Sequence, residues 1–240
     1  EHTDVSLTSL SVGDKLEWNG SAWVNVTDKA AVTGSAPIYF EAGLGPNQEA
    51  LTGLNFALSG EAVIQDVTDN NFHAQGIRLL DTVGTGGNGT AGWEPGIDWT
   101  KNIRITFRMF IPNSGTVDDI IVGMAGEADM TNQLKISINP YHNVYKANVN
   151  NVDLRSVAFT ATPADSPCGK WNTFIAEITK VNGRRIMKLK KYQNGEPLTC
   201  IACDVTGFGE VWGGVYFNAW NGAAIPSYNV MLQSFQVEYI

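Results

Sequence analysis

The residues of this sequence that could do acid–base or nucleophilic chemistry are few and widely spaced. Glycoside hydrolysis needs two carboxylates that flank one bond, one protonated and one ionised. Glu127 and Asp129 come closest to this arrangement, but the neighbouring Gly126 predicts that both lie at a loop tip. The 3 histidines are far apart, and none has a nucleophile motif beside it. The spacing therefore predicts a protein that is not an enzyme.

Metal-binding residue types are present without a metal-binding pattern. The 3 cysteines are Cys168, Cys200 and Cys203, and their single C-x-x-C pair lacks the second pair or the histidines of a zinc site. We expect buried thiols, or a disulfide from Cys168 to one of the other two. We expect no cofactor, and a bound calcium ion is the less favoured alternative. Asp66 and Asp69 in "DVTDNN" supply carboxylate oxygens, although such clusters also form ordinary turns.

Aromatic and amide side chains in predicted loops favour a different chemistry, the binding of sugars. An aromatic face packs against sugar C–H groups, while Asn, Asp and Gln exchange hydrogen bonds with hydroxyls. The segment "FNAWNGAAIPSY" is the most promising loop, because Asn218 and Asn221 flank Trp220. A capping role for Trp220 at the end of the fold is the alternative. The predicted glycan-binding residues are Trp220, Asn218, Asn221, Tyr228, Trp93 and Tyr141.

Four further loop residues suit the same chemistry, whereas two tryptophans do not. The four are Trp99, Asp98, Asn139 and Asn143. Trp171 and Trp212 lie inside strand patterns, so we expect both in the core.

Composition and charge restrict the class of protein. Of 240 residues, 43% are hydrophobic, 17% are charged and 25 are glycine, which is typical of short strands and many turns around a sizeable core. The net charge of −8 disfavours nucleic acid as a partner. No apolar stretch is long enough for membrane insertion. In the basic run "GRRIMKLKK" we expect the solvated face of a strand, formed by Arg184, Arg185, Lys188, Lys190 and Lys191.

Hydrophobic alternation predicts strands throughout the chain, and no window keeps a helical period. In "IRITFRMFIP", Ile103, Ile105 and Phe107 alternate with polar residues, as expected for one buried and one wet face. The Gly-rich segment 83–96 is expected to be a long loop. Such spacing indicates an all-β fold of two stacked antiparallel sheets. Strands are predicted near residues 38–42, 61–66, 76–80, 103–111, 118–125, 133–139, 143–149, 153–159, 172–181, 184–193, 198–204, 212–220 and 228–239.

The N-terminal segment contains a separate hairpin. "KLEWNGSAWVNV" alternates on both sides of Asn19-Gly20, the strongest short signal for a hairpin turn. Trp18 and Trp23 would then pair across the two strands. The small and polar segment that follows is typical of a linker. We therefore predict a hairpin element at 1–30, a linker at 31–37 and a β-sandwich at 38–240.

Two parts of the chain resemble known families. Residues 5–26 carry the pattern L-x-V-G-D-x-L-x-W-N-G-S-x-W-V-N and resemble an element of tail fibres and other appendages of bacteriophages. Residues 38–240, with "GKWNTFIAEIT" and "GRRIMKLKKYQNGEPL", resemble the concanavalin A-like, laminin G-like jelly roll. The first resemblance implies a trimer, with a hairpin packed on its own sandwich as the alternative. In the trimer, the copies would share a core made of Leu16, Trp18, Trp23 and Val24.

Together the resemblances imply a virion appendage protein, either a phage fibre or a capsid decoration. It would be extracellular, at the virion surface. Its partners would be two further copies of the chain in a homotrimer, other virion proteins, and a glycan or receptor on the host surface. Jelly rolls carry unrelated activities, so the fold by itself does not define a function. The alternative is a secreted carbohydrate-binding module or adhesin of non-viral origin, which would be a monomer.

The shared-core interpretation predicts that the hairpin controls assembly. Deletion of residues 1–30 should convert a trimer into folded monomers, with unchanged thermal unfolding of the sandwich. Trp18→Ala should weaken assembly by about 2–4 kcal/mol per chain through lost aromatic burial. Analytical ultracentrifugation checks both changes. A truncated chain that still sediments as a trimer would place assembly in the sandwich instead.

Overall fold

The computed structural model describes strands in every part of the chain, and the prediction of an all-β fold is confirmed. The chain divides into two compact units, residues 1–36 and 37–240. No helix among the described residues is long and apolar enough to cross a membrane. The described residues are 5–6, 15–18, 23–26, 38–41, 56–69, 72–80, 87–113, 117, 119–127, 129, 131–159, 166–193, 196–220 and 230–240.

The N-terminal unit contains the predicted hairpin. Strand β2 (Lys15–Trp18) pairs with β3 (Trp23–Val26) in an antiparallel ladder that places Trp18 directly opposite Trp23. Strand β1 (Val5–Ser6) adds to the other edge of β3 in parallel. An aromatic pair at one register position is the arrangement that stabilises a short ladder. The part that these tryptophans play in assembly stays a prediction.

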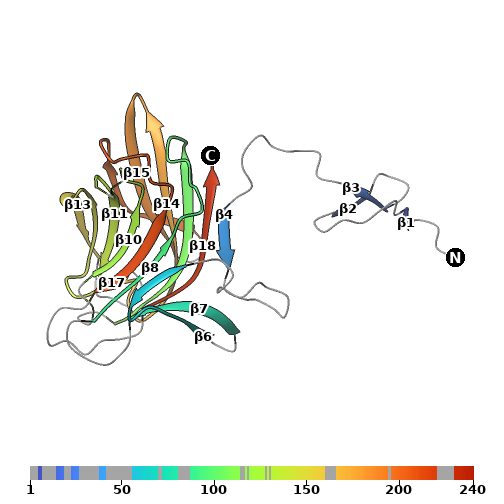
Figure 1. Ribbon diagram of the computed structural model, residues 1–240, viewed down its shortest axis with the longest axis horizontal. Helices are drawn as coiled ribbons and strands as arrows, with labels where there is room; N and C mark the ends of the chain where they lie inside the picture. The colour runs from blue at the N-terminus through green and yellow to red at the C-terminus, as the bar shows by residue number, and fades with distance from the viewer. Residues whose placement is uncertain are drawn as a thin grey trace. The chain divides into compact units, whose positions relative to one another are not determined.

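The second unit is a sandwich of two antiparallel sheets, and Figure 1 shows the two layers. The first layer, called the front sheet, has seven strands in the order β13-β12-β11-β10-β17-β8-β5. Its strands are β5 (Ala57–Gly60), β8 (Asn88–Trp93), β10 (Asp119–Met124), β11 (Leu134–Asn139), β12 (Val144–Val149), β13 (Val152–Ala158) and β17 (Val215–Trp220).

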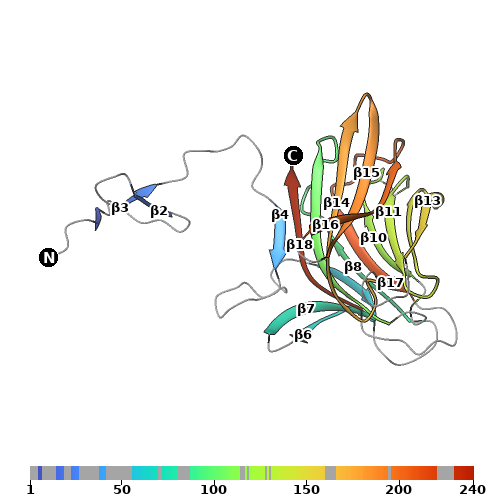
Figure 2. The same cartoon turned by 180° about the vertical axis from the view of Figure 1, so that it is seen from behind.

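The second layer, called the back sheet, has eight strands, and seven of them follow the order β16-β15-β14-β9-β18-β7-β6. The remaining strand, β4, pairs with residues 234–237 of β18, and the views in Figures 1 and 2 show the two strands side by side. The strands are β4 (Ile38–Glu41), β6 (Val63–Asp69), β7 (Phe72–Leu80), β9 (Ile103–Ile111), β14 (Lys170–Val181), β15 (Arg184–Gln193), β16 (Glu196–Asp204) and β18 (Val230–Tyr239).

The core lies between the two sheets and follows the predicted alternation. In β9 every second residue from Ile103 is buried, as expected. Phe107 of this strand stacks on Phe174 at 5.3 Å and meets Phe217 of the front sheet edge-on at 6.2 Å. Each fully buried phenylalanine contributes roughly 1.5–3 kcal/mol by leaving water. These rings therefore hold the two sheets together.

The Gly-rich segment 83–96 is not one long loop, because β8 runs through it between β17 and β5. A Cβ atom on Gly89 would lie 1.6 Å from the carbonyl oxygen of Leu79, so only glycine allows this approach of two backbones. Glycine is rare in strands, and the sequence pattern therefore pointed to a loop. Tertiary pairing overrides that local preference.

The basic run in β15 is not a uniform solvated face, and that prediction was wrong. Arg185 and Lys191 are each only 4% exposed, whereas the side chain of Arg184 is 72% exposed. Successive residues of a strand point to opposite faces, so Arg184 and Arg185 cannot share one.

A matched pair of glycines in β8 tests the close-approach argument. Gly89→Ala should lower the free energy of unfolding by about 3 kcal/mol, because its methyl group would overlap the Leu79 carbonyl. Gly92→Ala is the control, since the nearest atom to its Cβ lies 3.8 Å away. Urea unfolding of both variants checks the prediction. Equal stability would mean that the backbone relaxes around Gly89.

Candidate functional site

The outer face of the front sheet carries two of the predicted sugar-binding residues. In β17, Val215, Phe217 and Ala219 are buried in the core. The residues between them therefore point to the outer face of the sheet. They are Tyr216, Asn218 and Trp220. Trp220 is 45% exposed, so its large apolar ring is accessible to a ligand.

Trp220 stands in a row of polar residues that crosses the sheet. It lies opposite Asn88 of β8 on one side and Asp119 of β10 on the other. The Asp119 carboxylate accepts hydrogen bonds from the hydroxyl of Ser137 and, at 3.2 Å, from the amide of Asn139. An accessible indole between an amide and a carboxylate is suited to a sugar ring with several hydroxyls.

Asn218 completes this arrangement, and its amide is held in place. Its Nδ2 donates to Asn88 Oδ1 at 2.6 Å, to Thr90 Oγ1 at 2.8 Å and to the Gly89 carbonyl at 3.2 Å. The amides beside the indole therefore have a defined orientation before any ligand arrives, which reduces the entropy lost on binding. We call these residues the Trp220 surface: Asn88, Asp119, Asn218 and Trp220.

Tyr141 is connected to this surface through Asn139. Its ring is 44% exposed and meets the ring of His142 edge-on at 4.8 Å. Asn139 is buried, and its Oδ1 accepts a hydrogen bond at 2.7 Å from the backbone N–H of His142. Because Asn139 also donates to Asp119, it fastens the turn that carries Tyr141 to the row of Trp220.

Trp93 and Trp99 do not belong to the Trp220 surface. Trp93 stacks on Phe56 at 5.4 Å and meets the core residue Phe235 edge-on at 5.9 Å, so much of its ring is used in packing. Trp99 is completely buried, and its predicted exposure in a loop was wrong. Asn221 and Tyr228 lie outside the described residues.

The residues considered for catalysis or metal binding either have a structural role or do not cluster with one another. Asp129 lies in the loop after β10 and accepts hydrogen bonds from the N–H and hydroxyl of Thr131, which hold its pKa below the usual value. All three cysteines are free thiols, and burial raises their pKa. The backbone at Asp66 and Asp69 is part of β6. Among the described residues no acidic, histidine or cysteine cluster could hold a metal ion, and calcium stays a prediction.

A cleft of about 680 Å³ opens on the same outer face, and the sequence did not indicate it. Trp212 and Tyr216 stand in it with their ring centres 6.4 Å apart. The expected core position of Trp212 was wrong, and so was that of Trp171, which lies half-buried beneath Arg108 on the back sheet. The cleft is lined by Ala57, Leu58, Ser59, Thr90, Gly92, Trp93, Glu94, Gln133, Trp212 and Tyr216.

Backbone hydrogen bonds join the loops that supply one end of this cleft. The N–H of Ile97 donates to the Gly213 carbonyl at 2.8 Å, and the N–H of Trp212 donates to the Gly126 carbonyl at 3.0 Å. The loops 94–102 and 205–214 are thereby linked to each other and to the loop after β10. These hydrogen bonds therefore hold in place the segment that contains Trp212.

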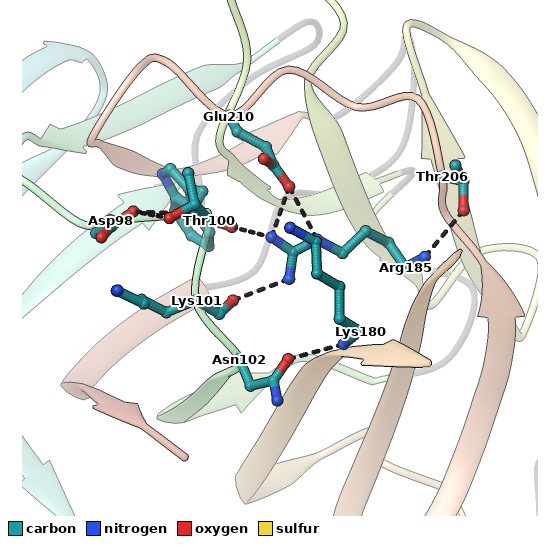
Figure 3. A network of polar contacts seen from close by, with 9 residues as sticks. Asp98, Thr100, Lys101, Asn102, Lys180, Arg185, Thr206 and Glu210 are labelled. Carbon is teal, nitrogen blue, oxygen red and sulfur yellow. Dashed lines mark hydrogen bonds and ion pairs between the residues drawn. The ribbon is translucent and has the colours of Figure 1, made fainter. Parts of the chain in front are cut away.

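The buried guanidinium of Arg185 also links the same loops through hydrogen bonds (Figure 3). It donates to Glu210 at 2.6 and 2.8 Å, to the Trp99 carbonyl at 2.6 Å and to the Lys101 carbonyl at 2.9 Å. Figure 3 shows Glu210 and the Lys101 carbonyl approaching the guanidinium from different sides. One side chain of the back sheet thus satisfies polar groups of both loops.

The fold agrees with that of solved lectins, and the predicted concanavalin A-like jelly roll is confirmed. Lectin II from Ulex europaeus is 13% identical, with 85% of this chain and 98% of that chain covered at a TM-score of 0.59. The basic winged bean lectin with Tn-antigen is 15% identical, with 85% and 99% covered at a TM-score of 0.58.

A further solved structure gives the same result. The VIP36 exoplasmic/lumenal domain, in its Ca2+/Man3GlcNAc-bound form, is 13% identical, with 77% of this chain and 84% of that chain covered at a TM-score of 0.55. At such low identity the similarity establishes the fold alone. No protein-family model matches the sequence, and curated proteins show no significant match.

Two adjacent arginines test the role of the buried guanidinium. Arg185→Met should lower the free energy of unfolding by about 3 kcal/mol, because Glu210 and two carbonyls lose their donor. Arg184→Met should change it by less than about 1 kcal/mol, since Arg184 forms an exposed pair with Asp204. Thermal and urea unfolding of both variants give the comparison. A similar, small loss for both would show that the loops are held without Arg185.

Proposed function

We propose that the sandwich unit is a glycan-binding module and that the Trp220 surface is its binding site. One observation carries this proposal: an accessible indole lies in register between Asn88 and Asp119 on an open sheet face. A sugar ring stacked on the indole would bring its hydroxyls within reach of amide and carboxylate groups on both sides.

The lectins that share this fold support the choice of ligand class. The winged bean lectin is described with Tn-antigen, and the VIP36 domain with Man3GlcNAc and calcium. Tn-antigen and Man3GlcNAc are ligands of those two proteins. For the present chain they support only the proposed class of ligand, a glycan. The proposal concerns binding and includes no catalytic step. The Ca2+-bound form of the VIP36 domain supports calcium as a further ligand in this proposal.

We further propose that the module belongs to a virion appendage, displayed at the virion surface as a trimer. Support for this part comes from the N-terminal sequence pattern and from the register that places Trp18 opposite Trp23. Three weak sites presented together gain apparent affinity by factors of about 10²–10⁴ without a strong single site. A shallow surface such as that of Trp220 suits this mode of attachment to host glycans.

A secreted adhesin or carbohydrate-binding module without viral origin is the second candidate. It shares the same sugar-binding surface and differs in assembly, because a monomer would have to bind by a single site. Light scattering separates the two: a trimer supports the appendage, and a monomer that binds glycans supports the adhesin.

Substitution of the exposed tryptophan tests the binding site. Trp220→Ala should weaken binding to the glycans that the wild-type chain selects on an array by about 2 kcal/mol, or roughly 30-fold. Tyr192→Ala is the matched control, because Tyr192 is equally exposed, at 45%, and lies on β15 of the back sheet. Surface plasmon resonance gives the affinities.

The outcome of this comparison decides the assignment. Loss with Trp220→Ala and unchanged binding with Tyr192→Ala support the Trp220 surface. Equal affinities for the wild-type chain and Trp220→Ala would move the site elsewhere on the sandwich. A wild-type chain that selects no glycan would remove the proposed function.

A further inference from the structure

Two of the three aromatic rings that line the cleft, those of Trp212 and Tyr216, lie over glycines. A Cβ atom on Gly123 would lie 2.2 Å from ring carbons of Tyr216, and a Cβ on Gly214 would lie 2.3 Å from the indole of Trp212. Each ring therefore covers a position of the outer face where any side chain larger than hydrogen would displace it. Covering glycines with aromatic rings shields the backbone and leaves the ring lying against the sheet.

A buried amide beside these rings has an unused polar atom. Gln133 is 6% exposed and lines the cleft. Its Oε1 accepts a hydrogen bond from the Tyr216 hydroxyl at 3.2 Å, while its Nε2 has no hydrogen-bond partner among the residues that the structure describes. Burial raises the pKa of Tyr216 to about 12, so this hydroxyl stays protonated at neutral pH and remains a donor.

An unpaired buried amide is a feature that a ligand can use. Leaving such a group without a partner is unfavourable, and a ligand oxygen of matching position would recover the lost hydrogen bond. A sugar hydroxyl suits this position because it can both accept and donate. The adjacent rings of Trp212 and Tyr216 offer apolar faces to the C–H groups of the same sugar.

The charge of the cleft restricts the kind of sugar. Among the described lining residues, Glu94 is the only acidic or basic side chain. The whole chain also carries a net charge of −8. Carboxylated or sulfated glycans would be repelled, so the cleft favours a neutral glycan.

The cleft is continuous with the Trp220 surface along two paired strands. Three successive pairs on the outer face of β17 and β8 are Trp220 with Asn88, Asn218 with Thr90, and Tyr216 with Gly92. The middle pair joins the two regions, because Thr90 lines the cleft and accepts the hydrogen bond of Asn218. Trp220 and Tyr216 are four residues apart, which corresponds to roughly 13 Å along the strand.

We propose that the cleft is a second sugar subsite and that the protein binds an extended, neutral oligosaccharide lying across β17 and β8. This inference rests on the proposed glycan-binding function and adds the form of the ligand. One sugar unit stacks on Trp220, and a later unit of the same chain enters the cleft and lies on the rings of Trp212 and Tyr216. A single terminal sugar would occupy only one of the two regions.

The dependence of affinity on chain length tests this proposal. The probes are neutral gluco-, manno-, galacto- and N-acetylglucosamine oligosaccharides of one to six units, titrated by calorimetry against the full chain. We expect the affinity of the recognised series to rise about tenfold when the oligosaccharide becomes long enough to reach from Trp220 to the cleft. Gly92→Leu should remove this gain and leave the binding of short members unchanged, because its side chain enters the cleft.

A loss of binding in these variants can be distinguished from a loss of folding. A Cβ on Gly92 meets no atom closer than 3.8 Å, so the backbone tolerates a side chain there. Gly92→Ala is the matched control and should keep most of the length dependence. Gln133→Leu removes the amide and should reduce the gain as well. Circular dichroism and urea unfolding confirm that each variant is folded.

Each outcome separates the proposals. Unchanged length dependence in folded Gly92→Leu, or a wild-type affinity that does not rise with length, overturns the second subsite and leaves the Trp220 site standing. Loss of all binding in Gly92→Leu with full binding in Trp220→Ala places the whole site in the cleft and overturns the extended ligand. A wild-type chain that binds none of the four series overturns the proposed function itself.

Discussion

The burial of one face of every strand is the constraint on which the rest of the sandwich depends. Phe107 of the back sheet stacks on Phe174 and meets Phe217 of the front sheet, and these contacts set which face of β17 is buried. Since the side chains of a strand alternate, the same contacts line up Tyr216, Asn218 and Trp220 on the opposite face. The proposed binding surface is thus a direct consequence of core packing, and it is carried by a rigid strand.

Glycine acts as a spacing device at three positions of the front sheet. At Gly89 it allows the backbone of β8 to approach Leu79, and at Gly123 and Gly214 it leaves room for aromatic rings. The pairing of β8 with β17 separately brings Asn88 and Thr90 to Asn218. The room left at Gly123 and Gly214 lets the rings of Tyr216 and Trp212 lie on the outer face. The high glycine content is therefore related both to the architecture and to the outer face that we propose binds sugars.

The ends of the sandwich position the side chains that the strands do not carry. Arg185 and a set of backbone hydrogen bonds brace the loops around Trp212, and Asn139 fastens the turn of Tyr141 to Asp119. Preformed groups of this kind lose little entropy when they bind. In the proposed trimer, the N-terminal hairpin would multiply the weak affinity of such a site by presenting several copies at once.

The sequence by itself determined the features that depend on neighbours along the chain: the all-β class, the alternation of β9 and the Asn19-Gly20 hairpin. Only the tertiary structure decided that Asn88 meets Asn218 across 130 residues, that Trp212 lines a cleft, and that a Gly-rich segment is a strand. Local spacing sets which way a side chain points within its strand. Strand order and register set what it meets, and these arise from contacts between residues far apart in the chain.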